Sequence, residues 1–65
     1  MKIKLNGEAK EIQATTLGAL MEELELTKKT VATALNSNFV PAEERDTCTL
    51  SEGDLIEIVE PIQGG

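Results

Sequence analysis

Gln63, Gly64 and Gly65, at the C-terminal end, are the residues whose types and position could do chemistry. Because glycine has no Cβ, a chain ending on two glycines can enter a channel too narrow for a side chain. The reactive group at this end is the α-carboxylate of Gly65. A carboxylate is a poor electrophile, since its charge is delocalised and no good leaving group is present. We therefore expect a partner enzyme to activate it, most simply as an acyl-adenylate made with ATP.

The rest of the sequence offers little catalytic machinery. It contains no histidine, which excludes histidine-based triads, common zinc sites and the usual proton shuttle near neutral pH. Cys48 has no cationic residue beside it to stabilise a thiolate, so we expect a buried or half-buried filler. The acidic pairs Glu22-Glu23 and Glu43-Glu44 are expected to be solvated surface. These observations predict that the protein is not an enzyme and holds no metal or cofactor of its own.

Composition limits the possible partners. The chain has 65 residues, enough for one small domain, with a net charge of −6 and a pI of about 4.4. Phe39 is the only aromatic residue, so neither basic surfaces nor stacking rings suggest nucleic acid. The acidity suits a positively charged partner, or solubility alone. One cysteine and no long apolar run predict a cytoplasmic protein that does not enter a membrane.

The first half of the chain predicts a hairpin followed by a helix. Apolar residues alternate with polar ones in the first strand: Met1, Ile3 and Leu5. Asn6-Gly7 is the strongest short hairpin signal, and a weaker return strand is expected at residues 8–13, with Ile12 pointing inward. Thr16 is a good N-cap, and an apolar stripe follows at helical spacing: Leu17, Leu20, Met21 and Leu24. Gly18 is expected to weaken the first helical turn by up to about 1 kcal/mol relative to alanine.

The second half predicts several short elements. They are a strand at 31–35, a turn at 36–38, an extended pair at 39–40, one helical turn at 42–46, a brief strand at 47–50, a turn at 51–54 and a last strand at 55–59. In the last strand Ile56 and Ile58 share one face, and Leu55, Glu57 and Val59 share the other.

This order of elements predicts an α+β fold, a mixed sheet with one main helix packed on one face. The first and last strands are strongly apolar, which suits parallel neighbours in the centre of the sheet. That is the β-grasp, or ubiquitin-like, arrangement. We expect a β-grasp domain at residues 1–61 and a flexible diglycine tail at residues 62–65.

Over essentially its whole length the chain resembles the ThiS-type sulfur carriers of thiamin biosynthesis. The resemblance rests on the order and spacing of weak elements: Asn6-Gly7, Thr16-Leu17, Leu20-Met21, Leu24, Asn36 through Val40-Pro41, Glu52-Gly53-Asp54, Ile56-Glu57-Ile58-Val59 and Gly64-Gly65. The family often has an aromatic residue near Arg45 to Thr47, which this sequence lacks.

The resemblance implies a chemistry and a set of partners. A ThiF-type adenylating enzyme would activate the Gly65 carboxylate with ATP, which the partner uses. A persulfide sulfur, from a cysteine desulfurase or another donor, would then displace AMP and leave a C-terminal thiocarboxylate. The acceptor in this family is the thiazole synthase. Gly65 would be the modified terminus, with Gly64 and Gln63 giving access to it.

A docking surface is also expected near the tail. Leu55 and Val59 lie on the face opposite the helix, with Glu57 between them and Ile62 beyond, and together they could bind a partner enzyme. The alternative is that loops cover these side chains, or that they are scattered exposed aliphatics.

Three other functions share parts of this pattern. The small subunit of molybdopterin synthase has the same fold, diglycine and adenylation step, although such chains tend to be longer. A ubiquitin-like modifier would instead attach Gly65 to a lysine of another protein. A non-covalent β-grasp binding module would not need the diglycine.

Overall fold

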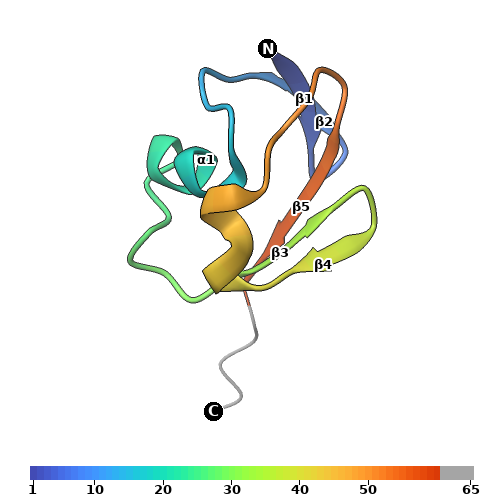
Figure 1. The fold of residues 1–65 in the computed structure, drawn as a ribbon. Coiled ribbons are helices and arrows are strands. Elements are labelled where there is room, and N and C mark those ends of the chain that lie inside the picture. The colour runs from blue at the N-terminus through green and yellow to red at the C-terminus, as the bar shows by residue number, and fades with distance from the viewer. Residues whose placement is uncertain (61–65) are drawn as a thin grey trace.

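The computed structural model describes residues 1–60, which form a five-stranded mixed sheet with the helices on one face (Figure 1). The elements in chain order are β1 (Lys2–Leu5), β2 (Glu8–Glu11), α1 (Leu17–Glu23), β3 (Ala32–Leu35), β4 (Asn38–Val40), the 3-10 helix η1 (Ala42–Thr47) and β5 (Leu55–Val59). The predicted tail at residues 62–65, and the boundary placed at residue 61, lie outside the described residues.

The sheet confirms the predicted β-grasp arrangement. Its strands lie in the order β2-β1-β5-β3-β4. The first and last strands, β1 and β5, are parallel neighbours, with Lys4 beside Leu55, while the other pairs are antiparallel. In Figure 1, α1 and η1 lie on the same side of the sheet, so no helix within residues 1–60 covers its other face.

Two tight turns shape the hairpins. Asn6 and Gly7 join β1 to β2 with φ of 51° and 89°, and Asn36 and Ser37 join β3 to β4 with φ of 49° and 74°. Two successive positive φ values are typical of the type I′ turn, whose twist matches that of the flanking strands. The predicted turn at 36–38 is therefore one residue shorter, because Asn38 already belongs to β4.

Helix α1 begins and packs as its sequence predicts. The Thr16 hydroxyl accepts a hydrogen bond from the Ala19 N–H at 3.1 Å, which is an N-cap. Three residues of the predicted stripe are buried, and the fourth, Leu24, is the partly buried C-cap. Gly18 has a packing role as well: a Cβ there would collide with the Asp46 carboxylate and come within 3.1 Å of the Asp46 Cα. The glycine thus permits η1 to lie against α1.

The core between sheet and helix is aliphatic. Its most completely buried apolar side chains come from β1, the β2–α1 connection, α1 and β5: Ile3, Ile12, Leu17, Leu20 and Ile56. Ile12 points inward as expected, although β2 ends at Glu11 rather than at residue 13.

The prediction of a strand at 47–50 was wrong. Thr47 belongs to η1, and only Thr49 makes an isolated bridge, to Thr16. The reason is that the segment pairs with the start of α1: the Leu17 N–H donates to the Cys48 carbonyl at 2.9 Å, and the Leu50 N–H donates to the Thr15 carbonyl at 2.9 Å. Cys48 is a free, half-buried thiol, as expected.

Candidate functional site

Strand β5 is the element that leads toward the predicted reactive end of the chain. It lies in the middle of the sheet, between β1 and β3. The residues predicted to react or to give access, Gly65, Gly64 and Gln63, lie outside the described residues, as does Ile62 of the predicted docking surface. The described part of the site is therefore β5 and the strands beside it.

The outward residues of β5 are exposed, which excludes the alternative that loops cover them. Leu55 is 50% exposed and Val59 is 57% exposed, and Glu57 between them is also exposed. Ile56 and Ile58 alternate with them and are buried under the helix. A strand whose two faces differ so clearly has a fixed register, because a slip of one residue would exchange the two sets.

Sequence reasoning missed the most exposed large apolar residue on this side of the sheet. Phe39 of β4 is 69% exposed. It pairs with Ala34 of β3, which in turn pairs with Glu57, and directly opposed residues share one face of a sheet. We call the surface made of Ala34, Phe39, Leu55, Glu57 and Val59 the open face. The sequence marked Phe39 only as the lone aromatic residue next to Val40. The side chain of Val40 is buried.

Two asparagine side chains hold β5 from its two sides. On the β1 side, the Asn6 Nδ2 donates to the Ile58 carbonyl at 3.0 Å, and the Ile58 N–H donates to the Asn6 Oδ1 at 2.9 Å. On the β3 side, the Leu55 N–H donates to the Asn36 Oδ1 at 3.0 Å, and the Asn36 Nδ2 donates to Asp54 at 3.1 Å. We call the first pair of bonds the Asn6 clamp. It extends the pairing of β5 beyond the point where β1 turns away.

The last described residue carries an ion pair. The Lys29 Nζ lies 3.4 Å from a carboxylate oxygen of Glu60, and both side chains are exposed. An exposed pair of this kind contributes at most about 1 kcal/mol. It links the connection after α1 to the residue that follows β5.

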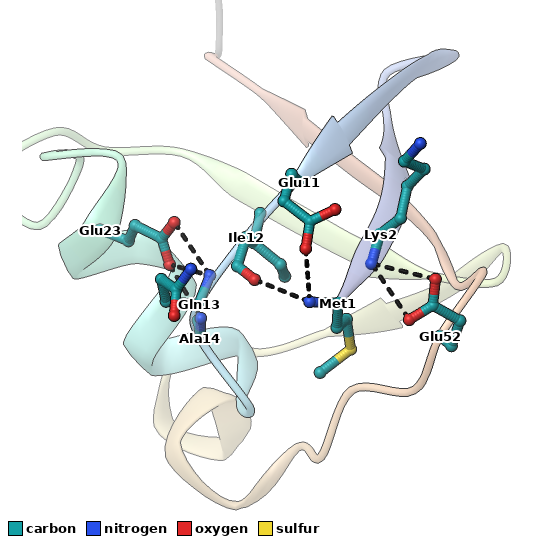
Figure 2. A network of polar contacts seen from close by, with 8 residues as sticks. All are labelled: Met1, Lys2, Glu11, Ile12, Gln13, Ala14, Glu23 and Glu52. Atoms are coloured by element: carbon teal, nitrogen blue, oxygen red, sulfur yellow. Dashed lines mark hydrogen bonds and ion pairs between the residues drawn. The ribbon is translucent and has the colours of Figure 1, made fainter.

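At the opposite end of the sheet, an ion pair joins the N-terminal ammonium to β2 (Figure 2). The Met1 ammonium donates to the Glu11 carboxylate at 2.8 Å and to the Ile12 carbonyl at 3.0 Å. The hydrogen bond to Glu11 raises the pKa of the Met1 amine above its usual value, and the same bond lowers the pKa of Glu11. This pair is far along β1 from the end of β5, so its role is structural.

The sequence predicts that Glu23 is a solvated surface residue, but its carboxylate also accepts backbone hydrogen bonds. Its carboxylate accepts hydrogen bonds from the backbone N–H groups of Gln13 and Ala14, the latter at 2.8 Å (Figure 2). Glu52 similarly accepts from the Lys2 N–H at 3.1 Å. The two carboxylates thus provide acceptors for backbone N–H groups at residues 2, 13 and 14.

Residues 1–60 contain no cluster of metal ligands and no helix that could span a membrane. Within this range no three histidine, cysteine or acidic residues gather as metal ligands would. None of the helices in the same range has the length and apolar character needed to cross a bilayer.

A mixed five-stranded sheet, covered by helices on one face only and with parallel first and last strands, defines a β-grasp protein. The chain belongs to the ThiS family, whose model matches residues 3–65. It is similar to the sulfur carrier protein ThiS of Thermus thermophilus, with 36% identity over 61 residues, covering 94% of this chain and 95% of that relative.

Two solved structures share the fold. The crystal structure of the thiamine biosynthesis protein ThiS from Geobacter metallireducens has a TM-score of 0.85 at 23% identity, with all of both chains covered. The solution structure of a thiamine biosynthesis protein from the same organism has a TM-score of 0.79 at 23% identity, covering 100% of this chain and 88% of that one.

Proposed function

We propose that this protein is a sulfur carrier of thiamin biosynthesis. The observation that carries the proposal is the match to the ThiS family over residues 3–65, a range that includes Gly64 and Gly65. The named function of the Thermus thermophilus relative, which is aligned over nearly its full length, supports it. No observation favours the molybdopterin, modifier or non-covalent functions over this one.

The chemistry takes place on Gly65. Its carboxylate oxygen attacks the α-phosphorus of ATP in a ThiF-type enzyme, pyrophosphate leaves, and an acyl-adenylate results. The terminal sulfur of a persulfide then attacks the carbonyl carbon and AMP leaves. A thiol finally attacks the donor's sulfur in this acyl disulfide, forms a new disulfide with it, and releases the thiocarboxylate. The carrier supplies the acyl group, while the partners supply ATP, sulfur and catalysis.

The open face is the surface that we propose for docking. Exposed apolar area flanked by the charged side chains of Lys4 and Glu57 suits a partner with an apolar patch and complementary charges at its rim. Leu55 and Val59 lie on the strand that leads to Gly65, so a partner bound there is close to the start of the tail. Phe39 widens this surface on the β4 side.

The same surface would serve the other proposed partners, a persulfide donor such as a cysteine desulfurase and the thiazole synthase that accepts the sulfur. The chain itself is not an enzyme in this proposal. Its one thiol, Cys48, is half-buried and unpaired, which suits a reducing cytoplasm.

The test is an intact mass after incubation with ATP, a ThiF-type enzyme and a persulfide donor. We expect a gain equal to the replacement of one oxygen by sulfur, and no gain for a chain without Gly65. If that enzyme loads its own carrier but not this one, the proposal fails. A new bond to a lysine of another protein would establish the modifier function instead.

A further inference from the structure

The turn between β1 and β2 contains Asn6-Gly7, a sequence that can react, and the Asn6 side chain also binds β5. Asn6 and Gly7 are both exposed, and Gly7 has open space around it, since a Cβ built there meets no atom within 4 Å. Water therefore reaches both residues. Yet the side-chain amide of Asn6 is occupied on both of its polar atoms by the backbone of Ile58.

An asparagine followed by glycine can deamidate without an enzyme. The Gly7 backbone nitrogen attacks the Asn6 Cγ, a new C–N bond closes a five-membered succinimide, and the Cγ–Nδ2 bond breaks. The proton lost by the Gly7 nitrogen leaves with the side-chain nitrogen as ammonia. One water then opens the ring at either carbonyl, giving aspartate or isoaspartate. Glycine favours the attack because no side chain crowds its nitrogen.

The Asn6 clamp opposes this reaction. Closing the ring requires the Asn6 Cγ to turn toward the Gly7 nitrogen, and this breaks both hydrogen bonds to Ile58. The orientation of the amide is set by its partners, because a flipped amide would place Nδ2 against an N–H and Oδ1 against a carbonyl. Two such bonds would slow the reaction by about five- to a hundredfold relative to the unfolded chain.

We propose that Asn6–Gly7 is a site of spontaneous deamidation and that the Asn6 clamp suppresses this reaction in the folded chain. When Asn6 separates from β5, the reaction can proceed and leaves a permanent covalent change. Neither product can restore the clamp. Aspartate has no donor for the Ile58 carbonyl and sets a negatively charged oxygen against it. Isoaspartate also adds a methylene to the backbone of a two-residue turn.

Asn36 provides an internal comparison. It lies in a turn with the same pair of positive φ values, and its side chain also binds β5. The following residue is Ser37, whose side chain crowds the attacking nitrogen. In the unfolded chain we therefore expect Asn6 to deamidate faster than Asn36.

The experiment follows deamidation of the complete chain at mildly alkaline pH, folded in buffer and unfolded in urea. Peptide mapping locates each mass change, and isoaspartate is measured directly. We expect Asn6 to be the first site in urea and to react about five- to a hundredfold more slowly in the folded chain. Equal rates in both states, or an unfolded chain in which Asn6 stays intact, would overturn the proposal.

A synthetic chain separates the clamp from the turn geometry. Replacing the amide N–H of Ile58 by an ester oxygen removes one clamp bond and keeps every side chain. We expect Asn6 in this folded analogue to deamidate about two- to tenfold faster than in the normal chain. The matched control is the same change at Leu55, which removes the bond to Asn36 and should leave the Asn6 rate unchanged. Unchanged rates in both analogues would show that the clamp does not protect Asn6.

Discussion

Gly18 lies directly against Asp46, so that a Cβ on the glycine would be only 3.1 Å from the Asp46 Cα and would also meet its carboxylate. This contact joins the first turn of α1 to η1. Replacing the glycine therefore has two opposite effects on stability: helix propensity rises, and packing against η1 becomes worse.

We expect Gly18→Ala to destabilise the protein by up to about 2 kcal/mol, because overpacking costs about 1–3 kcal/mol and alanine contributes only roughly 1 kcal/mol to a helix. The free energy of unfolding in urea measures the change. Adding Asp46→Ala removes the carboxylate from the contact and should restore part of the loss. A Gly18→Ala variant more stable than the parent would show that η1 moves away at little cost.

We expect Val59→Asp to raise the KM for loading at least about tenfold, because it places a charge on the open face where the partner is proposed to dock. Since Val59 is exposed, the free energy of unfolding should change little. Kinetics of sulfur loading, read by intact mass, give the KM. The matched control is Lys10→Asp on β2, an exposed change away from the open face. Normal loading by folded Val59→Asp would exclude this surface.

Phe39 is expected to add to the same docking surface. Phe39→Ser should raise the KM for loading without lowering stability, because the ring is exposed and contributes little to the core. Loading kinetics beside a urea unfolding curve test both parts. A stability loss with an unchanged KM would assign Phe39 to the fold rather than to docking.

Glu23→Ala should destabilise the protein by about 1–2 kcal/mol, because the N–H groups of Gln13 and Ala14 lose their acceptor. Glu22→Ala is the matched control: this neighbour on α1 is also acidic and exposed, and its loss should be nearly neutral. Urea unfolding of the two variants makes the comparison. Equal effects would mean that the carboxylate of Glu23 contributes nothing specific.

The ion pair of Met1 and Glu11 should give stability a dependence on pH. Its raised pKa makes the amine contribute below the usual value of 8.0, and this contribution is lost as pH rises through the folded pKa. The lowered pKa of Glu11 makes the carboxylate contribute above its usual value of 4.5, and this is lost as pH falls through the folded pKa. The pair therefore acts in the window between these two limits.

An N-terminally acetylated chain tests this window, because acetylation removes the charge. We expect its urea midpoint to fall below that of the free chain near neutral pH and to approach it at both extremes. A difference that stays constant with pH would point to lost hydrogen bonding rather than to charge.

The sequence was most informative where a local pattern and the final packing agree. The alternation in β5, the Thr16 cap and the Asn6-Gly7 turn each depend on neighbouring residues, and each was confirmed. The prediction of a strand at 47–50 was wrong because the hydrogen-bond partners of this segment, Thr15 and Leu17, lie far away in the sequence. Propensity cannot show such a competition.

The exposed residues of the open face were predictable only along β5, and their role in docking stays a prediction. Leu55, Glu57 and Val59 were found from alternation, whereas Phe39 joins them through pairing across β3, which the sequence does not display. The half-buried contact of Arg45 was missed for the same reason. Its Nε donates to the Thr33 hydroxyl at 3.0 Å and its Nη2 to the Val31 carbonyl at 2.8 Å.

The parallel pairing of β1 with β5 brings together the beginning and the end of the described chain. β5 also separates β1 from β3, so a nascent chain on the ribosome cannot complete its sheet until residues 55–59 have left the exit tunnel. A product that terminates before residue 55 lacks the strand that joins β1 to β3. Incomplete translation products therefore cannot form the five-stranded sheet, and proteases can remove them as unfolded chains.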